Sequence, residues 1–203
     1  MNTENMKIIL ASASPRRREL LTQMGADFEV ITADASEESD ITSPTELTRE
    51  LARRKGQAVY EKLKANGNAD GKIIISADTV VAAEGEILGK PRDRDDAYRM
   101  IKLISGKTHE VVTGIGITVN GKTVTDFSRT LVRVEDIPDS EIWAYIDSGD
   151  PMDKAGAYGI QGAFSSWVSG IDGCYFGVVG LPLNTLSNLF YKCTGYYPKD
   201  IKG

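Results

Sequence analysis

Apolar and polar positions alternate in ways that divide the chain into short strands and longer helices. KIIL at 7–10 and KIIISADTVV at 72–81 are near-continuous apolar runs, which favour strands buried on both faces. FEVIT at 28–32 alternates apolar and polar side chains, as a half-buried strand does. Two long strands are predicted at 109–119 and 122–134. A short partner strand is expected at ILGKP, and two last strands in WVSGIDGCYFGVVG.

Helices are predicted where start and stop signals bracket the segments between these strands. They cover 15–24, 44–66, 93–105 and 139–149, with a final helix in LPLNTLSNLFYKC. Asn120-Gly121 separates the two longest strands, and this dipeptide is typical of a tight hairpin turn. Helices alternate with strands, yet hairpins occur among them. The sequence therefore predicts an α/β fold with a mixed sheet rather than a purely parallel one.

Composition and charge narrow the class of protein. The 203 residues suffice for one sizeable domain, and no linker-like stretch interrupts them, so a single domain over 1–203 is predicted. The net charge of −5 argues against non-specific binding to nucleic acid. The chain has two cysteines, no apolar signal region and no apolar run of about 18 residues. We therefore expect a cytoplasmic protein that binds neither nucleic acid nor membrane.

Three arginines crowd the start of the first predicted helix. Arg16, Arg17 and Arg18 follow a strand and a small-residue turn. The N-terminal end of a helix carries the positive pole of the helix dipole and unpaired N–H groups, so cations there are unfavourable. The arrangement makes sense if a multiply charged phosphate binds, with Ser12 and Ser14 as hydroxyl donors. The alternative is a solvated helix end with salt bridges.

Two charged residues interrupt apolar patterns. Lys55 breaks a helical stripe that is otherwise formed by Leu47, Leu51, Val59 and Leu63. Such a lysine either snorkels to solvent or meets a carboxylate or ligand. Asp78 lies inside the most apolar run of the chain, where a carboxylate is costly unless it is paired or bound to metal. We predict a base or a Mg²⁺ ligand, with a turn-capping aspartate as the alternative.

The remaining candidates are weaker. Lys90, in LGKP, suits a second contact to phosphate, although turn lysines are common. Glu37 and Glu38 lie in a polar loop and are usually solvated charges. His109 is the one histidine, and without a GxSxG elbow or zinc-ligand spacing it is interpreted as structural. Gln161, in glycine-rich DKAGAYGIQG, could contact a base edge, although a tightly packed turn explains the segment equally well.

Together these stretches resemble the Maf family of nucleoside triphosphate pyrophosphatases. The similarity covers nearly the whole chain, in the order LASASPRRRELL, SADTVV, LGKPRD, LISGKTHEVVTG, DKAGAYGIQG and VVGLPL. It is strongest to the branch that hydrolyses dTTP and UTP. The resemblance implies a mixed, bent β-sheet with flanking helices around a central cleft between two lobes, similar to the inosine-triphosphate pyrophosphatases. It also implies cleavage between the α and β phosphates, giving the monophosphate and pyrophosphate in a house-cleaning role.

The resemblance also assigns roles to residues. Asp78 matches the catalytic carboxylate, usually described as a proton acceptor. Glu37 matches the acidic residue of the loop after the second strand, although the loop ADASEESD departs from the usual pattern and leaves Glu38 as an alternative. The family needs a divalent metal, Mg²⁺ or Mn²⁺, and we expect Asp78 and Glu37 to hold it. Arg16, Thr79 and Gln161 match positions that separate this branch from the branch acting on 7-methyl-GTP. The full set of matching substrate-binding residues is Ser12, Arg16, Arg17, Lys55, Thr79, Lys90 and Gln161.

Two other functions stay open at this point. The first is a nucleotide-binding regulator of septum formation with little turnover, which the intact Asp78, lysines and arginines disfavour. The second is the same enzyme class with a purine preference, which Arg16 and Gln161 disfavour. The expected partner is a small-molecule nucleoside triphosphate. The sequence does not decide whether Asp78 is base or metal ligand, whether modified pyrimidines are substrates, or whether the chain forms a homodimer.

Overall fold

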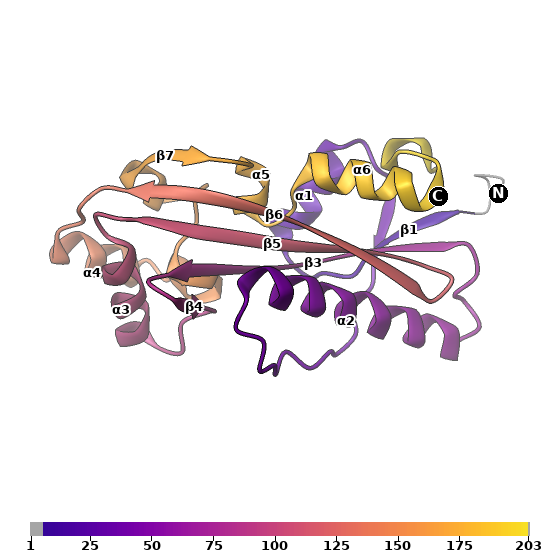
Figure 1. Cartoon of the computed structure of the whole chain (residues 1–203), viewed down its shortest axis with the longest axis horizontal. Coiled ribbons are helices and arrows are strands. Elements are labelled where there is room, and N and C mark those ends of the chain that lie inside the picture. Colours follow the sequence, from indigo (N-terminus) through magenta and orange to yellow (C-terminus); the bar gives the residue numbers. More distant parts are fainter. Residues whose placement is uncertain (1–5, 203) are drawn as a thin grey trace.

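The computed structural model describes residues 6–202 and confirms the mixed α/β prediction. One seven-stranded sheet runs through the molecule in the order β2-β1-β3-β5-β6-β7, with β4 also paired to β3 (Figure 1). The strands are β1 Lys7–Leu10, β2 Phe28–Val30, β3 Lys72–Ala83, β4 Glu86–Leu88, β5 Thr108–Val119, β6 Lys122–Val134 and β7 Val168–Asp172. β1 is parallel to β2 and β3, and the remaining pairs are antiparallel.

Helices cover both faces of this sheet. They are α1 Pro15–Gln23, α2 Pro44–Ala65, α3 Arg94–Ile104, α4 Asp139–Asp147, α5 Tyr175–Val179 and α6 Leu183–Thr194, with short 3-10 turns between Asp150 and Trp167 and at Pro198–Asp200. In Figure 1, α2 runs below the long strands and α6 lies above them. None of the described helices has the length and apolarity needed to cross a bilayer.

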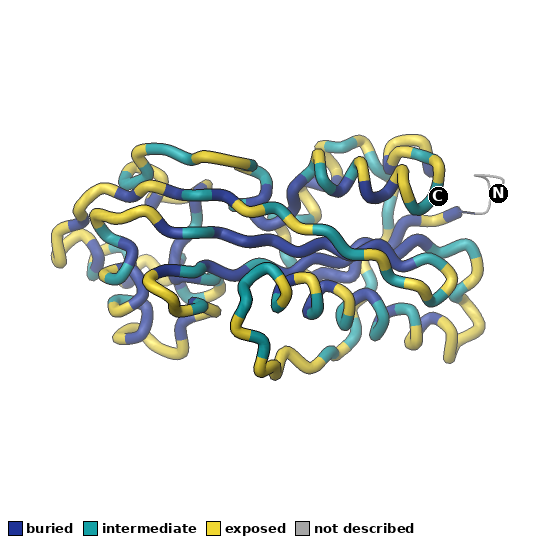
Figure 2. The backbone as a smooth tube through the Cα atoms, viewed as in Figure 1, coloured by how far each residue is buried: buried dark blue, intermediate teal, exposed yellow. Residues whose placement is uncertain are grey.

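The central strands are apolar along their whole length because both faces of the sheet are buried. On β3, Ile73 and Ile75 join the main core, whereas Ile74 packs into a smaller core beneath α2. The same alternation places Ile8 and Ile9 of β1 in the two different cores. Continuous apolar sequence is what a strand buried on both faces requires. Figure 2 shows the result as dark blue along the central strands.

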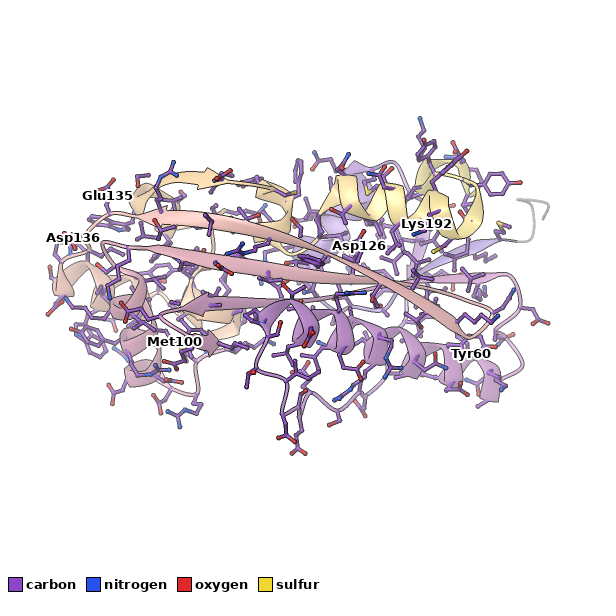
Figure 3. All side chains as sticks on the ribbon, in the orientation of Figure 1. Tyr60, Met100, Asp126, Glu135, Asp136 and Lys192 are labelled. Atoms are coloured by element: carbon purple, nitrogen blue, oxygen red, sulfur yellow. The ribbon has the colours of Figure 1, made fainter. Side chains whose placement is uncertain are left out.

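α2 approaches the sheet closely because the facing residues are small. A Cβ added at Gly114 of β5 would lie 2.4 Å from the backbone carbonyl of Thr48 on α2. Ser76 of β3 donates a 2.7 Å hydrogen bond to the carbonyl of Ala52. At the far end of the helix, the ring of Tyr60 lies against the β5–β6 turn at Gly121 (Figure 3). These contacts fix the height of α2, and hence of its polar side chains, above the strands.

The element predictions hold at most positions, including the hairpin. Asn120 and Gly121 have φ values of 50° and 77°, the left-handed pair that a tight hairpin turn needs. In WVSGIDGCYFGVVG, the first predicted strand is β7, but the prediction of a second strand is wrong, because YFGVV forms α5. Gly173 turns the chain at φ 129°, and Thr130 accepts from the Cys174 backbone N–H at 2.9 Å. The sulfur of Cys174 then accepts from the N–H of Gly177 and caps a helical turn.

Candidate active site

A single deep cleft gathers the predicted site residues. It has a volume of about 1140 Å³. It is lined by residues from the turn between β1 and α1, from α1, α2 and β3, and from the glycine-rich segment. Among the lining residues are all of the predicted ones: Ser12, Arg16, Arg17, Glu37, Lys55, Asp78, Thr79, Lys90 and Gln161. Segments that lie far apart in the chain therefore meet at one place.

The cleft opens where one edge of β3 lacks a neighbouring strand. β1 pairs with β3 over 72–75 and β4 pairs with it over 81–83, both on the edge that β5 does not occupy. The intervening residues, 76–80, have no strand partner on that edge among the described residues. Successive side chains of a strand point to opposite faces. Asp78 and Thr79 consequently reach the cleft from opposite faces of the sheet.

Asp78 is held by Lys55 of α2. The Lys55 Nζ lies 2.5 Å from Asp78 Oδ1 and 2.7 Å from Glu37 Oε1. The Asp78 carboxylate is mostly buried, with 11% of its side chain exposed, whereas the Glu37 side chain is 67% exposed. The lysine that interrupts the apolar stripe of α2 is thus paired with a carboxylate, as a buried charge requires. Oδ2 of Asp78 has no hydrogen-bond partner within residues 6–202 and is open to a ligand.

The charges around Glu37 favour its ionised form. The hydrogen bond from Lys55 is the main reason that the pKa of Glu37 is lowered, and Lys90 and Arg17 contribute by charge attraction. Lys90 makes no ion pair within the described part of the chain and its side chain is exposed. It therefore offers its full charge to an anion in the cleft.

The Asp78 and Glu37 carboxylates fit a divalent cation that arrives with a phosphate. Both contact the same ammonium, so the two lie close together. Mg²⁺ is typically bound by one or two carboxylates together with substrate phosphate oxygens and water. Residues 6–202 contain no group of three or more acidic, His or Cys side chains able to form a complete protein cage. The donor set thus suits a metal shared with substrate rather than a metal held by protein alone.

Arg17 is fixed in the cleft by three neutral acceptors. Its Nε donates to the carbonyl of Gly180 at 2.9 Å, its Nη1 to Ser12 Oγ at 3.2 Å and its Nη2 to Thr79 Oγ1 at 3.1 Å. Burial lowers the pKa of Arg17, and attraction by Asp78 opposes that shift. A guanidinium has five N–H donors. One donor on each Nη is left over, which is the pair that a phosphate can accept from.

The other two arginines of the turn behave differently. Arg16 lies 3.7 Å from Asp153 Oδ2, and Arg18 is exposed. Ser14 occupies the cap position of α1, but its side chain makes no capping hydrogen bond, so the first N–H groups of the helix stay open. Of the three cations, only Arg16 and Arg17 line the cleft. The predicted anion site therefore rests on these two and on the helix end.

A charged cluster that the sequence analysis missed anchors the segment carrying Gln161. Lys154 Nζ lies 3.0 Å from Asp150 Oδ1 and 2.7 Å from Asp153 Oδ1. Tyr145 donates to Asp150 Oδ2 at 2.6 Å and accepts from the Gly159 N–H at 3.2 Å. Burial alone would raise the pKa of Asp150, but the bonds from Tyr145 and Lys154 outweigh it and hold the pKa low. The opposite charges at 150 and 154, one helical turn apart, were the available signal.

His109 lies behind the cleft rather than in it. Its Nε2 is 2.7 Å from the hydroxyl of Tyr158, whose side chain lines the cleft. His109 is buried, and burial lowers its pKa to about 4. A neutral, enclosed imidazole is what a structural histidine would be. Sequence reasoning did not identify Tyr158 as part of the cleft wall.

Comparisons with known proteins find related sequences over most of the chain. A family model described as Maf-like protein matches residues 7–193. The dTTP/UTP pyrophosphatase of Thermococcus onnurineus (strain NA1) is 47% identical over 182 residues, covering 90% of this chain and 95% of that protein. The dTTP/UTP pyrophosphatase of Thermoanaerobacter sp. (strain X514) is 47% identical over 189 residues, covering 92% and 96%. Among solved structures, the Staphylococcus aureus Ham1 protein gives a TM-score of 0.44 at 15% identity, covering 64% of this chain and 72% of that one.

Proposed function

This chain belongs to the Maf family, and from that premise we propose that it is a nucleoside triphosphate pyrophosphatase that hydrolyses dTTP and UTP to the monophosphate and pyrophosphate. One observation carries the proposal. The cleft brings the Asp78 carboxylate, with one oxygen free, to the same place as the Arg17 guanidinium, with two N–H donors free. A phosphoryl-transfer site needs such a carboxylate beside charge-stabilising donors.

The reaction we propose is in-line attack of water on the α-phosphorus. Arg17 and Lys90, which have no carboxylate partner within residues 6–202, hold phosphate oxygens and stabilise the charge that builds up on them. Lys55 fixes Asp78 in place, and Asp78 Oδ2 accepts the proton of the attacking water or holds the metal. The bond between the α and β phosphates breaks, and pyrophosphate leaves.

A divalent metal belongs to this proposal. Asp78 and Glu37 would hold Mg²⁺ or Mn²⁺ together with the nucleotide, and when bound the ion lowers the pKa of water and screens phosphate charge. Lys55, which contacts both carboxylates, would hold them in place beside such a metal.

The base would lie against the segment 155–162. Gln161 is exposed at the cleft, and its amide can donate to and accept from a pyrimidine edge. Arg16 also lines the cleft and lies 3.7 Å from Asp153, which precedes this segment. We propose that these two residues set the preference for pyrimidines. Thr79, in contrast, has its hydroxyl engaged by Arg17, so its part in selection runs through that arginine.

The names of the relatives favour an enzyme over a nucleotide-binding regulator, because the Thermococcus and Thermoanaerobacter proteins are both called pyrophosphatases. We propose a cytoplasmic setting, consistent with free thiols at Cys174 and Cys193. Nucleoside triphosphates are the partners that this function requires.

Pyrophosphate release from a panel of nucleotides tests the function. The panel is dTTP, UTP, CTP, GTP, ITP and 7-methyl-GTP, each with Mg²⁺ and with EDTA. We expect metal-dependent turnover led by dTTP and UTP. Turnover led by a purine would keep the phosphate site and refute the roles of Arg16 and Gln161. Tight nucleotide binding without turnover would favour the regulator instead.

A further inference from the structure

Arg17 owes its orientation to a chain of hydroxyl groups that continues behind it. The acceptor for Arg17 Nη2 is Thr79 Oγ1. Thr79 Oγ1 in turn lies 2.8 Å from Oγ1 of Thr113, which faces it across the β3–β5 pairing. Thr113 Oγ1 donates to the carbonyl of Gly177 in α5 at 2.8 Å. Thr113 is completely buried.

The direction of every bond in this chain is determined. A threonine hydroxyl has one proton. Thr113 gives its proton to Gly177, so in its contact with Thr79 it must accept. Thr79 therefore gives its proton to Thr113 and turns its lone pairs toward Arg17, which can only donate. The buried Thr113 hydroxyl thus fixes the rotation of the Thr79 hydroxyl, and with it the direction of the lone pairs that accept from the guanidinium.

The same arrangement couples Arg17 to α5 at two points. Arg17 Nε donates directly to Gly180 at the end of α5, and the hydroxyl chain reaches Gly177 one turn earlier. Gly177 and Gly180 suit these contacts because a Cβ at Gly177 would lie 3.0 Å from Ser128 Oγ, and Gly180 has φ 123°. The plane of the guanidinium is therefore set by β3, β5 and α5 together.

We infer that Thr113 is a positioning residue for the phosphate-binding arginine, acting through Thr79; this deepens the proposed function and rests on it. Thr113 does not line the cleft, so it does not touch the nucleotide. Its hydroxyl holds the two free Nη donors of Arg17 in the orientation that a phosphate meets. Preorganised donors of this kind are what an anion site needs, because no ordering remains to be done on binding.

The test compares Thr113→Val, which removes the hydroxyl at nearly constant shape, with Thr113→Ser, which keeps it. The first readout is the affinity for inorganic triphosphate by calorimetry, and the second is kcat and KM for dTTP. We expect Thr113→Val to bind triphosphate about tenfold more weakly than wild type, because loss of a neutral hydrogen bond from the chain that orients Arg17 is worth up to about this factor. Thr113→Ser should stay within about twofold of wild type.

Thr118→Val is the matched control. Thr118 lies on the same strand and is equally buried, but its hydroxyl bonds to Thr123 on the neighbouring strand rather than to the Arg17 chain. It should leave triphosphate affinity unchanged while losing similar stability in denaturant. The effect of Thr113→Val should also disappear when Arg17 is first changed to Met, because the two act in series.

The outcomes separate this inference from the function on which it rests. If wild type binds triphosphate but releases no pyrophosphate from dTTP, the proposed function fails, and a selective weakening by Thr113→Val still supports the positioning role. Equal affinity of wild type and Thr113→Val overturns the inference, as does an equal loss in Thr113→Val and Thr113→Ser. A full effect of Thr113→Val in the Arg17→Met background overturns it too.

Discussion

At the scale of single residues, the site is built from charges that the chain places where they are unfavourable without partners. Lys55 interrupts an apolar stripe, and Asp78 interrupts an apolar strand. The 2.5 Å contact between them satisfies both. Removing one partner of a buried pair costs more than the pair itself contributes, since the other charge is left unpaired. The ion pair therefore keeps both Lys55 and Asp78 charged and fixed in position at the cleft.

Asp78→Asn separates binding from chemistry. The amide keeps an oxygen for Lys55 but cannot accept a proton and is a poor metal ligand. We expect kcat for dTTP to fall by about 10²-fold or more, with nucleotide affinity largely retained. Asp126→Asn serves as the control and should keep wild-type turnover, because Asp126 lies on β6 and makes no ion pair within residues 6–202. Near wild-type kcat in Asp78→Asn would refute the proposed mechanism.

His109 should make the stability of the fold depend on pH. Its pKa falls from an ordinary 6.5 to about 4 on burial, so between these values the unfolded chain binds a proton that the folded chain does not. Stability is therefore complete above about pH 6.5 and is lost as pH falls toward 4. The difference is about 3 kcal/mol.

The unfolding free energy in urea, followed from pH 7.5 to pH 4 for wild type and His109→Gln, measures this loss. Glutamine can still bond to Tyr158 but does not titrate. The wild type should lose more stability than the variant over this interval, and parallel pH curves would show that His109 is not the cause.

At the scale of elements, the height of α2 decides whether Lys55 reaches Asp78. Gly114 and Ser76 allow the helix backbone to lie directly on the strands. The helix is long and well capped, with Ser43 accepting from the Glu46 N–H. The position of α2 is therefore set by its close packing on β3 and β5, whereas the cap only fixes where the helix begins.

Gly114→Ala should disrupt this position. The new Cβ would lie 2.4 Å from the backbone of Thr48, so the helix or the strand must move. We expect a loss of about 1–3 kcal/mol in unfolding free energy and a lower kcat for the molecules that still fold. Gly67→Ala is the control, because it strains a residue with φ 68° at the far end of α2 without contacting anything. It should lose stability but keep kcat per folded molecule, and the same pattern in Gly114→Ala would refute the account.

The sequence predicts elements better than it predicts contacts between them. Local patterns reveal β1, α1, α2 and the β5–β6 hairpin, because period and caps are local properties. β2 ends at Val30 rather than at 32, since its partner β1 ends at Leu10. YFGVV forms a helix because the hydroxyl of Thr130, on β6, accepts from the backbone N–H of the preceding Cys174 and fixes where the helix begins.

The same limit applies to the site. Lys55, Asp78 and Arg17 could be proposed because each breaks a local rule. Thr113 breaks none, since a threonine in a strand is ordinary, and its role depends on partners 34 and 64 positions away. The spacing of Asp150 and Lys154 could suggest an ion pair, but the hydrogen bond from Tyr145 to Asp150 could not be foreseen, because it depends on how α4 packs against the segment.

At the scale of the whole molecule, the cleft exists because one sheet is incomplete. β1 and β4 occupy two parts of the same edge of β3 and leave 76–80 open between them. An acidic chain of net charge −5 then concentrates five cations in that opening, which are Arg16, Arg17, Lys55, Lys90 and Lys154. Carboxylates within the cleft compensate three of them, and Arg17 and Lys90 remain for phosphate.

Hydrolysis of dTTP in oxygen-18 water, with the products analysed by mass spectrometry, tests the central claim most directly. Attack on the α-phosphorus puts one labelled oxygen into dTMP and none into pyrophosphate. That is the result we predict, with Mg²⁺ present and Asp78 intact. Label in pyrophosphate would place the attack on the β-phosphorus, and release of dTDP with inorganic phosphate would place it on the γ-phosphorus. Label in pyrophosphate would contradict the proposed attack on the α-phosphorus, and release of dTDP would contradict the assignment of this cleft to pyrophosphatase chemistry.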